Sequence, residues 1–433
     1  MKNILRIIAV LGILICINSC KTNNENVFKE IYNLIEENNY FEAKKFYESN
    51  KSTLSKPYQQ YFETILYNAF NRLEESDSYL NALLTGENNI PDSLKFQLYS
   101  IRSDNAVKMY NYKKAKNAIQ TILSEYKSYL DDEEMSSYEN TLKIWAALEN
   151  TPKQKTDINE NSIIKMEKDL VGLSTLKVFT NKDSLNFIFD TGANLSTTTQ
   201  SVAKRLNMEI IPVEVEVGTI TGDKVLGQLA VCEKLSLGNI EITHAIFLVL
   251  PDEALSFPQI NYKINGILGF PIFEALKEIR ITQNNELIVP QVQSTPPGNS
   301  NMAMNGLIPL IYINNKHFTF DTGADQTVLY KKYYDENKKD IDEKYKPEKI
   351  SFGGAGGKKE FEGYTIDYSL IVGEEYIKLE NVSLLKEEIK DSETVYGNIG
   401  QDLIKKFDVM IINFNQMFIK FERKSNATNN DFK

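Results

Sequence analysis

Apolar residues recur with a helical period in the first third of the chain. One set lies at the spacings i, i+4, i+7 and i+8, which place its members on one face of an amphipathic helix. The set consists of Val27, Ile31, Leu34 and Ile35. Glycine, which weakens helices, occurs between residues 27 and 150 at Gly86 alone. The pattern predicts an α-helical domain over residues 27–150.

Three segments of this domain share a loose pattern, in which a large or aromatic residue is followed by a small one. They begin at Asn39, Asn71 and Asn111, at spacings of 32 and 40 residues. A repeat near 34 residues resembles tetratricopeptide helix pairs, and a plain helical bundle is the alternative. Pro91 marks an interruption between hairpins. In either case we expect a docking or spacer surface, with a possible protein partner.

The pattern changes after a polar segment, residues 151–162, which contains Pro152 and is predicted to be a linker. Beyond it glycine becomes frequent, and β-branched and aromatic residues alternate with polar ones. This alternation is typical of β-strands. The chain is therefore predicted to be multidomain α+β, with helical hairpins first and an all-β part after them.

The all-β part contains an internal repeat. Residues 186–194 (NFIFDTGAN) match residues 317–325 (HFTFDTGAD) at an offset of 131. The same offset relates three pairs of glycines, which are Gly222 and Gly353, Gly266 and Gly397, and Gly269 and Gly400. Because separate landmarks keep one register, we infer a duplication that gives two lobes. The predicted boundaries are lobe 1 at 163–293, a linker at 294–304, lobe 2 at 305–425 and a tail at 426–433.

Composition excludes several classes of function. Asp and Glu number 59 against 49 Lys and Arg, a net charge of −10, whereas a nucleic-acid binder usually carries a basic surplus. The two histidines, His244 and His317, make a zinc enzyme or a Ser-His-Asp hydrolase improbable. Three cysteines are too few for a disulfide framework. No metal or organic cofactor is implied.

The first twenty residues resemble the signal of a bacterial lipoprotein. Lys2 and Arg6 precede an apolar run of about eleven residues, which suits a signal peptide and is short for a membrane span. The run ends in small residues before Cys20, as in a lipobox. The resemblance implies a signal peptide at 1–19, lipidation of Cys20 and a tether at 20–26. The alternatives are a plain signal peptide or an uncleaved anchor.

The lipoprotein interpretation predicts a protein of the bacterial cell envelope, held to the membrane by lipid on Cys20 and facing either the periplasm or the exterior. Cys232 is then the one remaining thiol. It lies in an apolar, strand-like run, so we expect it to be buried and inert.

The repeated features resemble the aspartic protease family. Each half has an apolar strand ending in Asp-Thr-Gly-Ala, a glycine-bearing hairpin about 30 residues later, and an apolar-apolar-Gly turn about 79 residues after the Asp. The Asp-Thr-Gly-Ala form is most similar to the retropepsin branch. The resemblance covers residues 163–425, about 60% of the chain. It implies two retropepsin-like lobes in one chain and therefore a catalytic monomer.

The resemblance implies that Asp190 and Asp321 form a catalytic pair. Two carboxyl groups about 3 Å apart cannot both ionise, so they share one proton. The ionised member can then take a proton from water while the protonated member polarises the scissile carbonyl. The pair titrates as a unit. Peptide bonds are the implied substrate.

The neighbouring residues are implied to support the catalytic loops. Thr191 and Thr322 would cross-link the two loops, and Gly192 and Gly323 would let the backbone approach the carboxylates.

Ala193 and Ala324 stand where pepsin-like members commonly have Ser. Each carboxylate would then accept one hydrogen bond fewer, and we expect an activity optimum at about pH 5–6, less acidic than that of pepsin.

Two hairpins are candidate flaps over the site, and the alternative is an ordinary glycine turn between strands. The first, residues 217–228, contains Gly222; the second, residues 350–364, contains Gly353 and Gly354. A flap must open for a peptide and then close to exclude water.

The apolar-apolar-Gly turns are implied to support the catalytic loops. The first reads Ile267-Leu268-Gly269, whereas the second has Asn398 at its first position and so departs from the pattern. For His317, four residues before Asp321 on a predicted strand, we expect a surface position rather than a catalytic one. We expect His244 in the core or at its rim.

The leading hypothesis is a membrane-anchored aspartic endopeptidase that acts on peptides or proteins. The alternative is a lipoprotein that binds a peptide or protein with a protease-like fold and does not cut it. In its favour are the departure at Asn398 and a helical domain suited to interaction. Against it, both aspartates are present. A third possibility is a protease restricted to one partner, or to its own chain.

Overall fold

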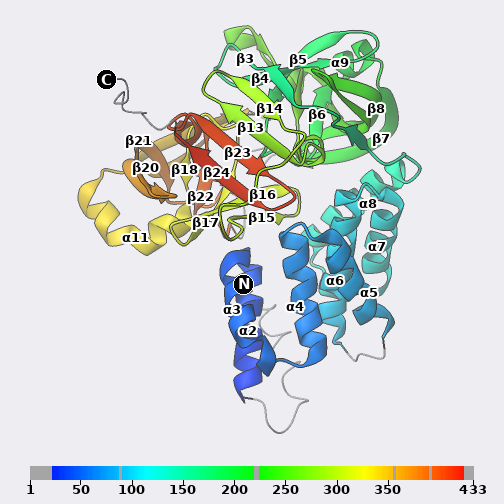
Figure 1. The fold of residues 1–433 in the computed structure, drawn as a ribbon, viewed down its shortest axis with the longest axis vertical. Helices are drawn as coiled ribbons and strands as arrows, with labels where there is room; N and C mark the ends of the chain where they lie inside the picture. Colours follow the sequence, from blue (N-terminus) through cyan, green and yellow to red (C-terminus); the bar gives the residue numbers. More distant parts are fainter. Residues whose placement is uncertain (1–21, 87–89, 219–223, 355–356, 390–392, 424–433) are drawn as a thin grey trace, which may run out of the picture.

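The computed structural model places a helical region below a β-rich region (Figure 1). The residues it describes are 22–86, 90–218, 224–354, 357–389 and 393–423. No helix among these residues is long and apolar enough to cross a membrane. Cys20 and Gly222 lie outside the described residues.

The helical region consists of consecutive helices that pack against one another. They are α2 (Thr22–Glu36), α3 (Tyr40–Asn50), α4 (Lys56–Ala69), α5 (Leu73–Thr85), α6 (Asp92–Lys108), α7 (Tyr112–Glu125) and α8 (Asp132–Leu148). Pro91 directly precedes α6. A capping box between Asp131 and Glu134 starts α8, because it satisfies backbone N–H groups that the helix itself leaves free.

The three segments with the shared sequence pattern all lie at turns between two helices. Asn38, Asn71 and Tyr110 end α2, α4 and α6 in the left-handed conformation, with φ of 55°, 55° and 54°. In each turn the next backbone N–H donates to a carbonyl five residues earlier, as it does from Asn111 to Ala106 at 2.7 Å. The repeated pattern therefore corresponds to one repeated turn.

Two large sheets form most of the β-rich region. The nine-stranded sheet of lobe 1 runs in the order β1 (Lys155–Asp157), β9 (Ile240–Leu250), β6 (Ser196–Thr199), β12 (Gly266–Leu268), β5 (Ser184–Phe189), β4 (Ser174–Phe179), β8 (Lys224–Leu237) and β7 (Glu209–Gly218), with β3 (Glu167–Lys168) beside β4. The eight-stranded sheet of lobe 2 runs in the order β15 (Met302–Asn305), β16 (Ile308–Ile313), β17 (Lys316–Phe320), β22 (Gly397–Ile399), β18 (Val328–Leu329), β21 (Glu375–Leu385), β20 (Gly357–Val372) and β19 (Glu348–Gly354). The short hairpin β10 (Ser256–Phe257) and β11 (Tyr262–Lys263) belongs to lobe 1.

A third sheet takes strands from both lobes and joins them. Its order is β2 (Ser162–Lys165), β14 (Glu286–Val289), β13 (Glu278–Thr282), β23 (Val409–Asn413) and β24 (Phe418–Glu422). The strand pair that joins the lobes is β13 with β23, in antiparallel register from Glu278 opposite Asn413. The two lobes therefore share backbone hydrogen bonds as well as a linker.

The strands that carry the Asp-Thr-Gly loops are paired alike in the two lobes. In lobe 1, β5 lies parallel to β12 with Ile188 opposite Ile267. In lobe 2, β17 lies parallel to β22 with Thr319 opposite Asn398, each 131 positions after its counterpart. The offset seen in the sequence thus holds in the strand register.

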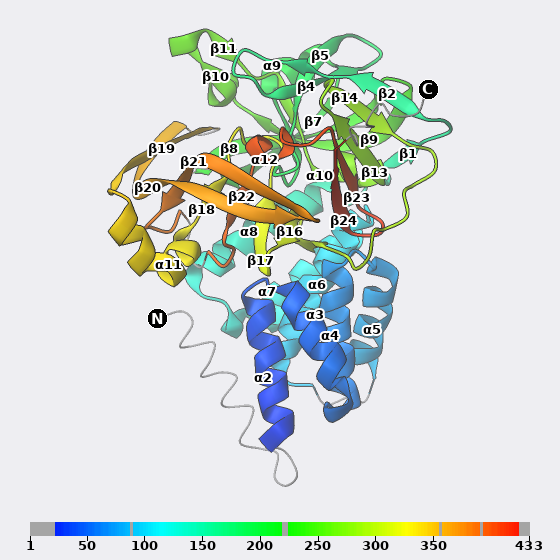
Figure 2. The same cartoon turned by 60° about the vertical axis from the view of Figure 1, so that its left-hand side comes forward.

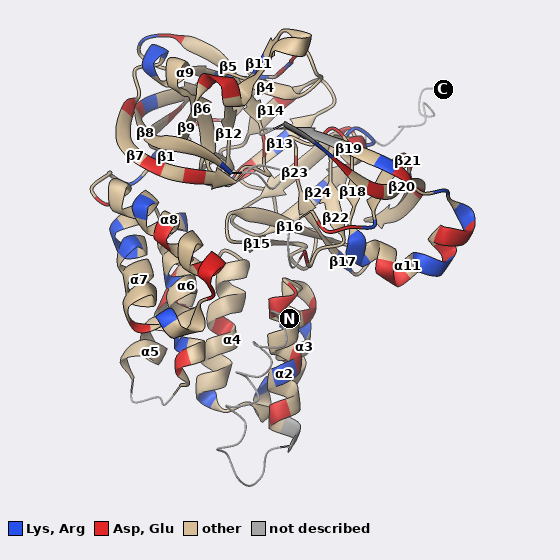
Figure 3. Ribbon diagram, turned by 180° about the vertical axis from the view of Figure 1, so that it is seen from behind, with Lys and Arg blue, Asp and Glu red and all other residues tan. Residues whose placement is uncertain are grey.

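The lobes differ in their helices. Lobe 1 has the short α9 (Gln200–Arg205) and α10 (Phe270–Ala275), whereas lobe 2 has α12 (Gln401–Ile404) and the 14-residue α11 (Lys331–Lys344). Acidic and basic residues follow one another along α11 (Figure 3).

The helical region contacts both lobes through its repeated turns. Asn38 donates to the Thr394 hydroxyl at 2.7 Å, Asn71 to the Phe414 carbonyl at 3.0 Å, and Tyr110 to the Pro271 carbonyl at 3.0 Å; the turns face the β-rich region in Figures 1 and 2. An apolar cluster also continues from the helices into lobe 1, and includes Trp145, Leu148, Leu229 and Ile246. The helical region is therefore packed onto the rest of the chain.

The expected surface position of His317 was wrong. Its side chain is fully buried, and Nε2 lies 3.0 Å from the backbone carbonyl of Glu37 because the end of α2 covers this part of β17. Burial and the nearby Lys332 cation lower the pKa of His317 to about 4, so the ring is neutral near pH 7. The sequence of lobe 2 alone does not show that a helix covers the strand.

Two other expectations hold. Cys232 is buried, and burial raises the pKa of its thiol to about 11, so the thiol is unreactive near neutral pH. His244 is half-buried within β9, at the rim of the core.

Candidate active site

Asp190 and Asp321 each follow directly after a buried strand. Asp190 succeeds β5 and Asp321 succeeds β17, and the backbone N–H of each donates to the partner strand, at 3.3 Å to Leu268 and 3.0 Å to Ile399. Alternating apolar residues hold these strands in the core, and the chain turns sharply at the Asp-Thr-Gly sequence. Both aspartates are half-buried.

The two threonines cross-link the loops. The backbone N–H of Thr191 donates to Oγ1 of Thr322 at 3.0 Å, and that of Thr322 donates to Oγ1 of Thr191 at 3.1 Å. Each hydroxyl donates in turn across the lobe boundary, from Thr191 to the Phe320 carbonyl at 3.1 Å and from Thr322 to the Phe189 carbonyl at 3.0 Å. Both threonines are buried, so these bonds fix the loops relative to one another.

The glycines allow each carboxyl group to lie against the opposite loop. A Cβ atom at Gly192 would lie 2.6 Å from Cγ of Asp321, and one at Gly323 would lie 2.5 Å from Cγ of Asp190. Non-bonded carbon atoms keep about 3.5–4.0 Å apart, so any side chain here would displace a carboxyl group. The loops thus bring the two carboxyl groups together across the lobe boundary.

Ala193 and Ala324 anchor the loops through their backbone. The carbonyl of Ala193 accepts from the N–H of Phe270 at 2.9 Å, and that of Ala324 accepts from the N–H of Gln401 at 2.9 Å. These donors open α10 and α12, which follow Gly269 and Gly400. The turns that contain Gly269 and Gly400 therefore pack directly against the Asp-Thr-Gly loops.

Burial and the nearby carboxyl group of Asp321 change the acidity of Asp190. Burial is the largest cause, and together with the charge of Asp321 and a hydrogen bond between the two groups it raises the pKa of Asp190 well above its usual value. The backbone N–H groups of Gly192 and Ala193 act in the opposite direction. The pair is therefore able to keep one proton under conditions in which an isolated Asp would be ionised.

The candidate flaps are antiparallel hairpins in the structure. β7 pairs with β8 up to Gly218 opposite Lys224, and β19 pairs with β20 up to Gly354 opposite Gly357. Gly353 and Gly354 lie at the end of β19. The backbone of β7 is held by the helical region, since Asn140 donates to the Glu216 carbonyl at 2.9 Å and accepts from its N–H at 2.8 Å.

Sequence reasoning missed the polar groups beside Asp321. Asn398 donates from Nδ2 to Oδ2 of Asp321 at 3.3 Å and accepts at Oδ1 from Thr319 at 2.7 Å. Tyr330 is within hydrogen-bonding reach of Thr319, and its hydroxyl also feels the charge of Asp321. The available signal was a polar residue at a position where the first lobe has Ile267.

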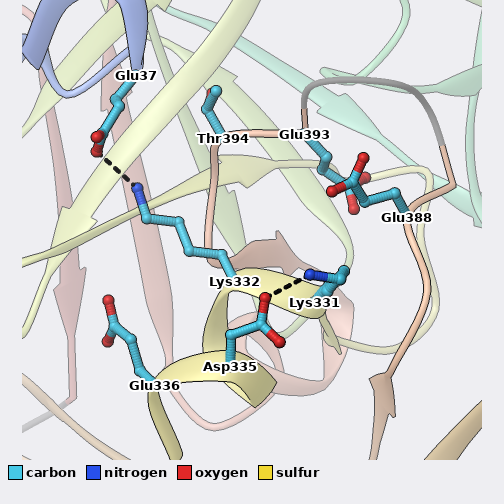
Figure 4. A pocket seen from close by; sticks show the side chains of 8 residues that line it. All are labelled: Glu37, Lys331, Lys332, Asp335, Glu336, Glu388, Glu393 and Thr394. Carbon is cyan, nitrogen blue, oxygen red and sulfur yellow. Dashed lines mark hydrogen bonds and ion pairs between the residues drawn. The ribbon is translucent and has the colours of Figure 1, made fainter. Parts of the chain in front are cut away.

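Two cavities have linings that include neither Asp190 nor Asp321. One of about 310 Å³ separates the end of α2 from α11, where Lys332 reaches Glu37 and Lys331 reaches Asp335 (Figure 4). The other, of about 90 Å³, lies in lobe 1 beside Ile188 and Tyr262. The described residues hold no cluster of three or more His, Cys, Asp or Glu suited to a metal ion.

A known protein family matches part of lobe 1. Residues 175–272 match the family model described as aspartyl protease. The aspartyl protease match includes Asp190 and Gly269 and ends before lobe 2 begins. The solved structure of conglutin gamma, a basic 7S globulin from lupine seeds, is similar at 9% identity and a TM-score of 0.40, over 61% of this chain and 95% of that chain. No curated protein matches the chain.

The position of Gly323 gives a first test of this geometry. Gly323→Ala is expected to lower kcat/KM for the peptide hydrolysis proposed below by about 10²-fold or more, because a misplacement of about 1 Å at reacting groups has effects of that size. The chain should still fold, since the added methyl group meets a movable carboxyl group. Gly298→Ala is the control, because a Cβ there has no neighbour within 4 Å. Activity of Gly323→Ala within about threefold of wild type would contradict the loop geometry.

The raised pKa of Asp190 gives a second test, which needs no substrate. A carboxyl whose pKa is higher in the folded state contributes stability that is present below its unfolded pKa and is lost as the pH rises through its folded pKa. Asp190→Asn should therefore unfold at a higher temperature than wild type at about pH 8, with a smaller difference at about pH 4.

The control for this test is Asp325→Asn, which removes an exposed carboxylate paired with Lys405. Exposed pairs contribute little, so no gain at the higher pH is expected there. Thermal unfolding of the three proteins at both pH values is the measurement. A lower unfolding temperature of Asp190→Asn at about pH 8 would contradict a raised pKa of Asp190 in the folded protein.

Proposed function

We propose that this chain is an aspartic endopeptidase that hydrolyses peptide bonds with a water molecule activated by Asp190 and Asp321. The observation that carries the proposal is the pairing of the two carboxyl groups across cross-linked Asp-Thr-Gly loops, with a raised pKa at Asp190. The aspartyl protease match of residues 175–272 supports it for lobe 1. Because both loops belong to one chain, a monomer is sufficient for activity.

The reaction begins with one proton on the pair. Water attacks the scissile carbonyl carbon and gives a proton to the ionised aspartate, while the protonated aspartate gives its proton to the carbonyl oxygen. A neutral tetrahedral diol results. The C–N bond then breaks as the amine nitrogen takes the proton that came from water, and a diol hydroxyl returns a proton to the other aspartate. The pair ends with one proton, as it began.

The threonines and glycines hold the pair for this reaction. Thr191 and Thr322 keep the loops at one separation, and Gly192 and Gly323 leave room for the carboxyl groups. We propose that the hairpins β7–β8 and β19–β20 act as flaps that cover a bound peptide. Their strand edges would let an extended peptide add as a further strand.

We also propose that lipid on Cys20 anchors the chain to a membrane of a bacterial cell envelope. The support is the lipobox-like sequence that ends at Cys20. The first described helix, α2, begins at the end of the helical region far from the lobes (Figures 1 and 2). An anchor there would hold the lobes away from the membrane surface, with the helical region between them. We further propose that the exposed side of the helices binds a partner protein.

Cleavage of an unfolded protein mixture tests the proposed activity. Residues 21–433 are incubated with the mixture from about pH 3 to pH 8, and the products are identified by mass spectrometry. Cleavage by wild type and none by Asp321→Asn, purified in the same way, is the expected result. New termini would also reveal the specificity. No cleavage by wild type at any pH would contradict a general endopeptidase and favour a protein that binds without cutting, or one dedicated partner.

A further inference from the structure

The two carboxyl groups have unequal surroundings. Asp321 accepts from the N–H groups of Gly323 at 2.7 Å and Ala324 at 3.1 Å, and from the side-chain amide of Asn398 at 3.3 Å. Asp190 accepts from the N–H of Gly192 at 2.8 Å, and the N–H of Ala193 also lowers its pKa. At the position that corresponds to Asn398, lobe 1 has Ile267, which has no polar atom to donate. The amide therefore distinguishes the two lobes.

The orientation of the Asn398 amide follows from its partners. A carboxylate oxygen only accepts hydrogen bonds, so the NH₂ end must face Asp321. The amide oxygen then faces the hydroxyl of Thr319 at 2.7 Å, which donates to it. Thr319 and Asn398 lie opposite one another on the parallel strands β17 and β22, so the strand register fixes this contact.

A donor to the ionised form of a carboxyl group favours ionisation of that group. We propose that Asn398 is a positioning residue that fixes the negative charge of the pair on Asp321 and its proton on Asp190. Asp321 is then the group that takes a proton from water, and Asp190 the group that protonates the carbonyl oxygen. This assignment rests on the proposed function and goes beyond it, because the symmetric motifs do not distinguish the two roles.

The titratable groups around Asp321 are compatible with this assignment. Asp190 faces it across the pair, and Tyr330 faces it from the turn before α11. Burial, with the charges of Glu393 and Asp321, raises the pKa of Tyr330, so its hydroxyl stays neutral over the range in which the aspartates titrate.

The first test is the pH dependence of kcat/KM in Asn398→Ile, which gives lobe 2 the residue type of lobe 1. The acidic limb, at which the pair loses its first proton, should move up by about one pH unit, because ionised Asp321 loses a donor. The basic limb, at which the pair loses its last proton, should stay at its wild-type pH, because in the proposed arrangement Asp321 is ionised both before and after that loss. Ile267→Val, the matched change in lobe 1, should leave both limbs in place.

Thr319→Val is the second variant, in case Asn398→Ile does not fold. It keeps the amide and removes the hydroxyl that orients it, so the acidic limb should move in the same direction by less. An acidic limb that stays in place in both variants, with only a uniform loss of rate, would overturn the proposal. Such a loss is what a purely structural role predicts.

Titration by ¹³C NMR of the aspartate carboxyl groups separates this proposal from the proposed function. The signals of Asp190 and Asp321 are assigned from the two Asn variants. In Asn398→Ile the lower of the pair's two titration steps should lie about one pH unit above its position in wild type. If wild type cuts no peptide, the activity proposal fails and this titration still decides the role of Asn398. An unchanged lower step would overturn it.

Discussion

Asp190→Asn and Asp321→Asn are each expected to lower kcat/KM for peptide hydrolysis by about 10²–10⁴-fold or more, the range of general acid–base catalysis. An amide cannot take a proton from water or give one to a leaving amine. In either variant one carboxyl group remains, and it has no partner with which to share a proton. Each substitution therefore removes both functions of the pair.

The measurement is kcat/KM on one peptide identified from the mixture assay, at the optimal pH of wild type. Asp325→Asn is the control, because this carboxylate lies two residues after Gly323 and is exposed. It should retain activity close to wild type. A variant of either Asp190 or Asp321 that kept more than about a tenth of the wild-type rate would be incompatible with the proposed mechanism.

Removal of the helical region is expected to prevent the rest of the chain from folding. A chain that begins at residue 151 would expose the lobe 1 side of the shared apolar cluster, including Leu229 and Ile246, to water. It would also leave His317 without the helix end that buries it. We expect this shortened chain to aggregate, or to lack a cooperative thermal transition, whereas residues 21–433 should be soluble.

A point substitution tests the interface between the helical region and the β-rich region with less disturbance of the fold. Asn71→Gly removes the donor to the Phe414 carbonyl and suits the left-handed backbone of this turn, and it should reduce stability by about 1–3 kcal/mol. Asn117→Ala changes an exposed residue of α7 and should stay within about 0.5 kcal/mol of wild type. A soluble shortened chain with a cooperative transition and full activity would show instead that the helical region is an independent docking domain.

The pairing of Asp190 and Asp321 was predictable because the two loops that bring them together share one local sequence. Asp, Thr and Gly are contiguous in each loop, so the repeat at Asp190 and Asp321 is visible without a structure. The helical character of residues 27–150 and the strands after residue 162 were also predictable, because burial imposes periods of 3.6 and 2 on the sequence.

What the sequence could not show are contacts between distant segments. His317 is buried by Glu37 and its neighbours, which are about 280 residues earlier in the chain. In the sequence, Asn398 is visible only as a departure from an apolar pattern. Its contact with Asp321 could not be predicted, because that contact depends on the register of β17 and β22. The five-stranded sheet shared by the lobes was missed for the same reason, since its strands come from the start, the middle and the end of the β-rich region.

The central claim is that Asp190 and Asp321 act as one unit. The most direct test is kcat/KM of the double variant Asp190→Asn/Asp321→Asn beside the two single variants, on the same peptide. Groups that act together show strongly non-additive losses, so the account predicts that the double variant is about as slow as either single variant. A double variant slower by the product of the two single losses would contradict it, because each aspartate would then contribute independently.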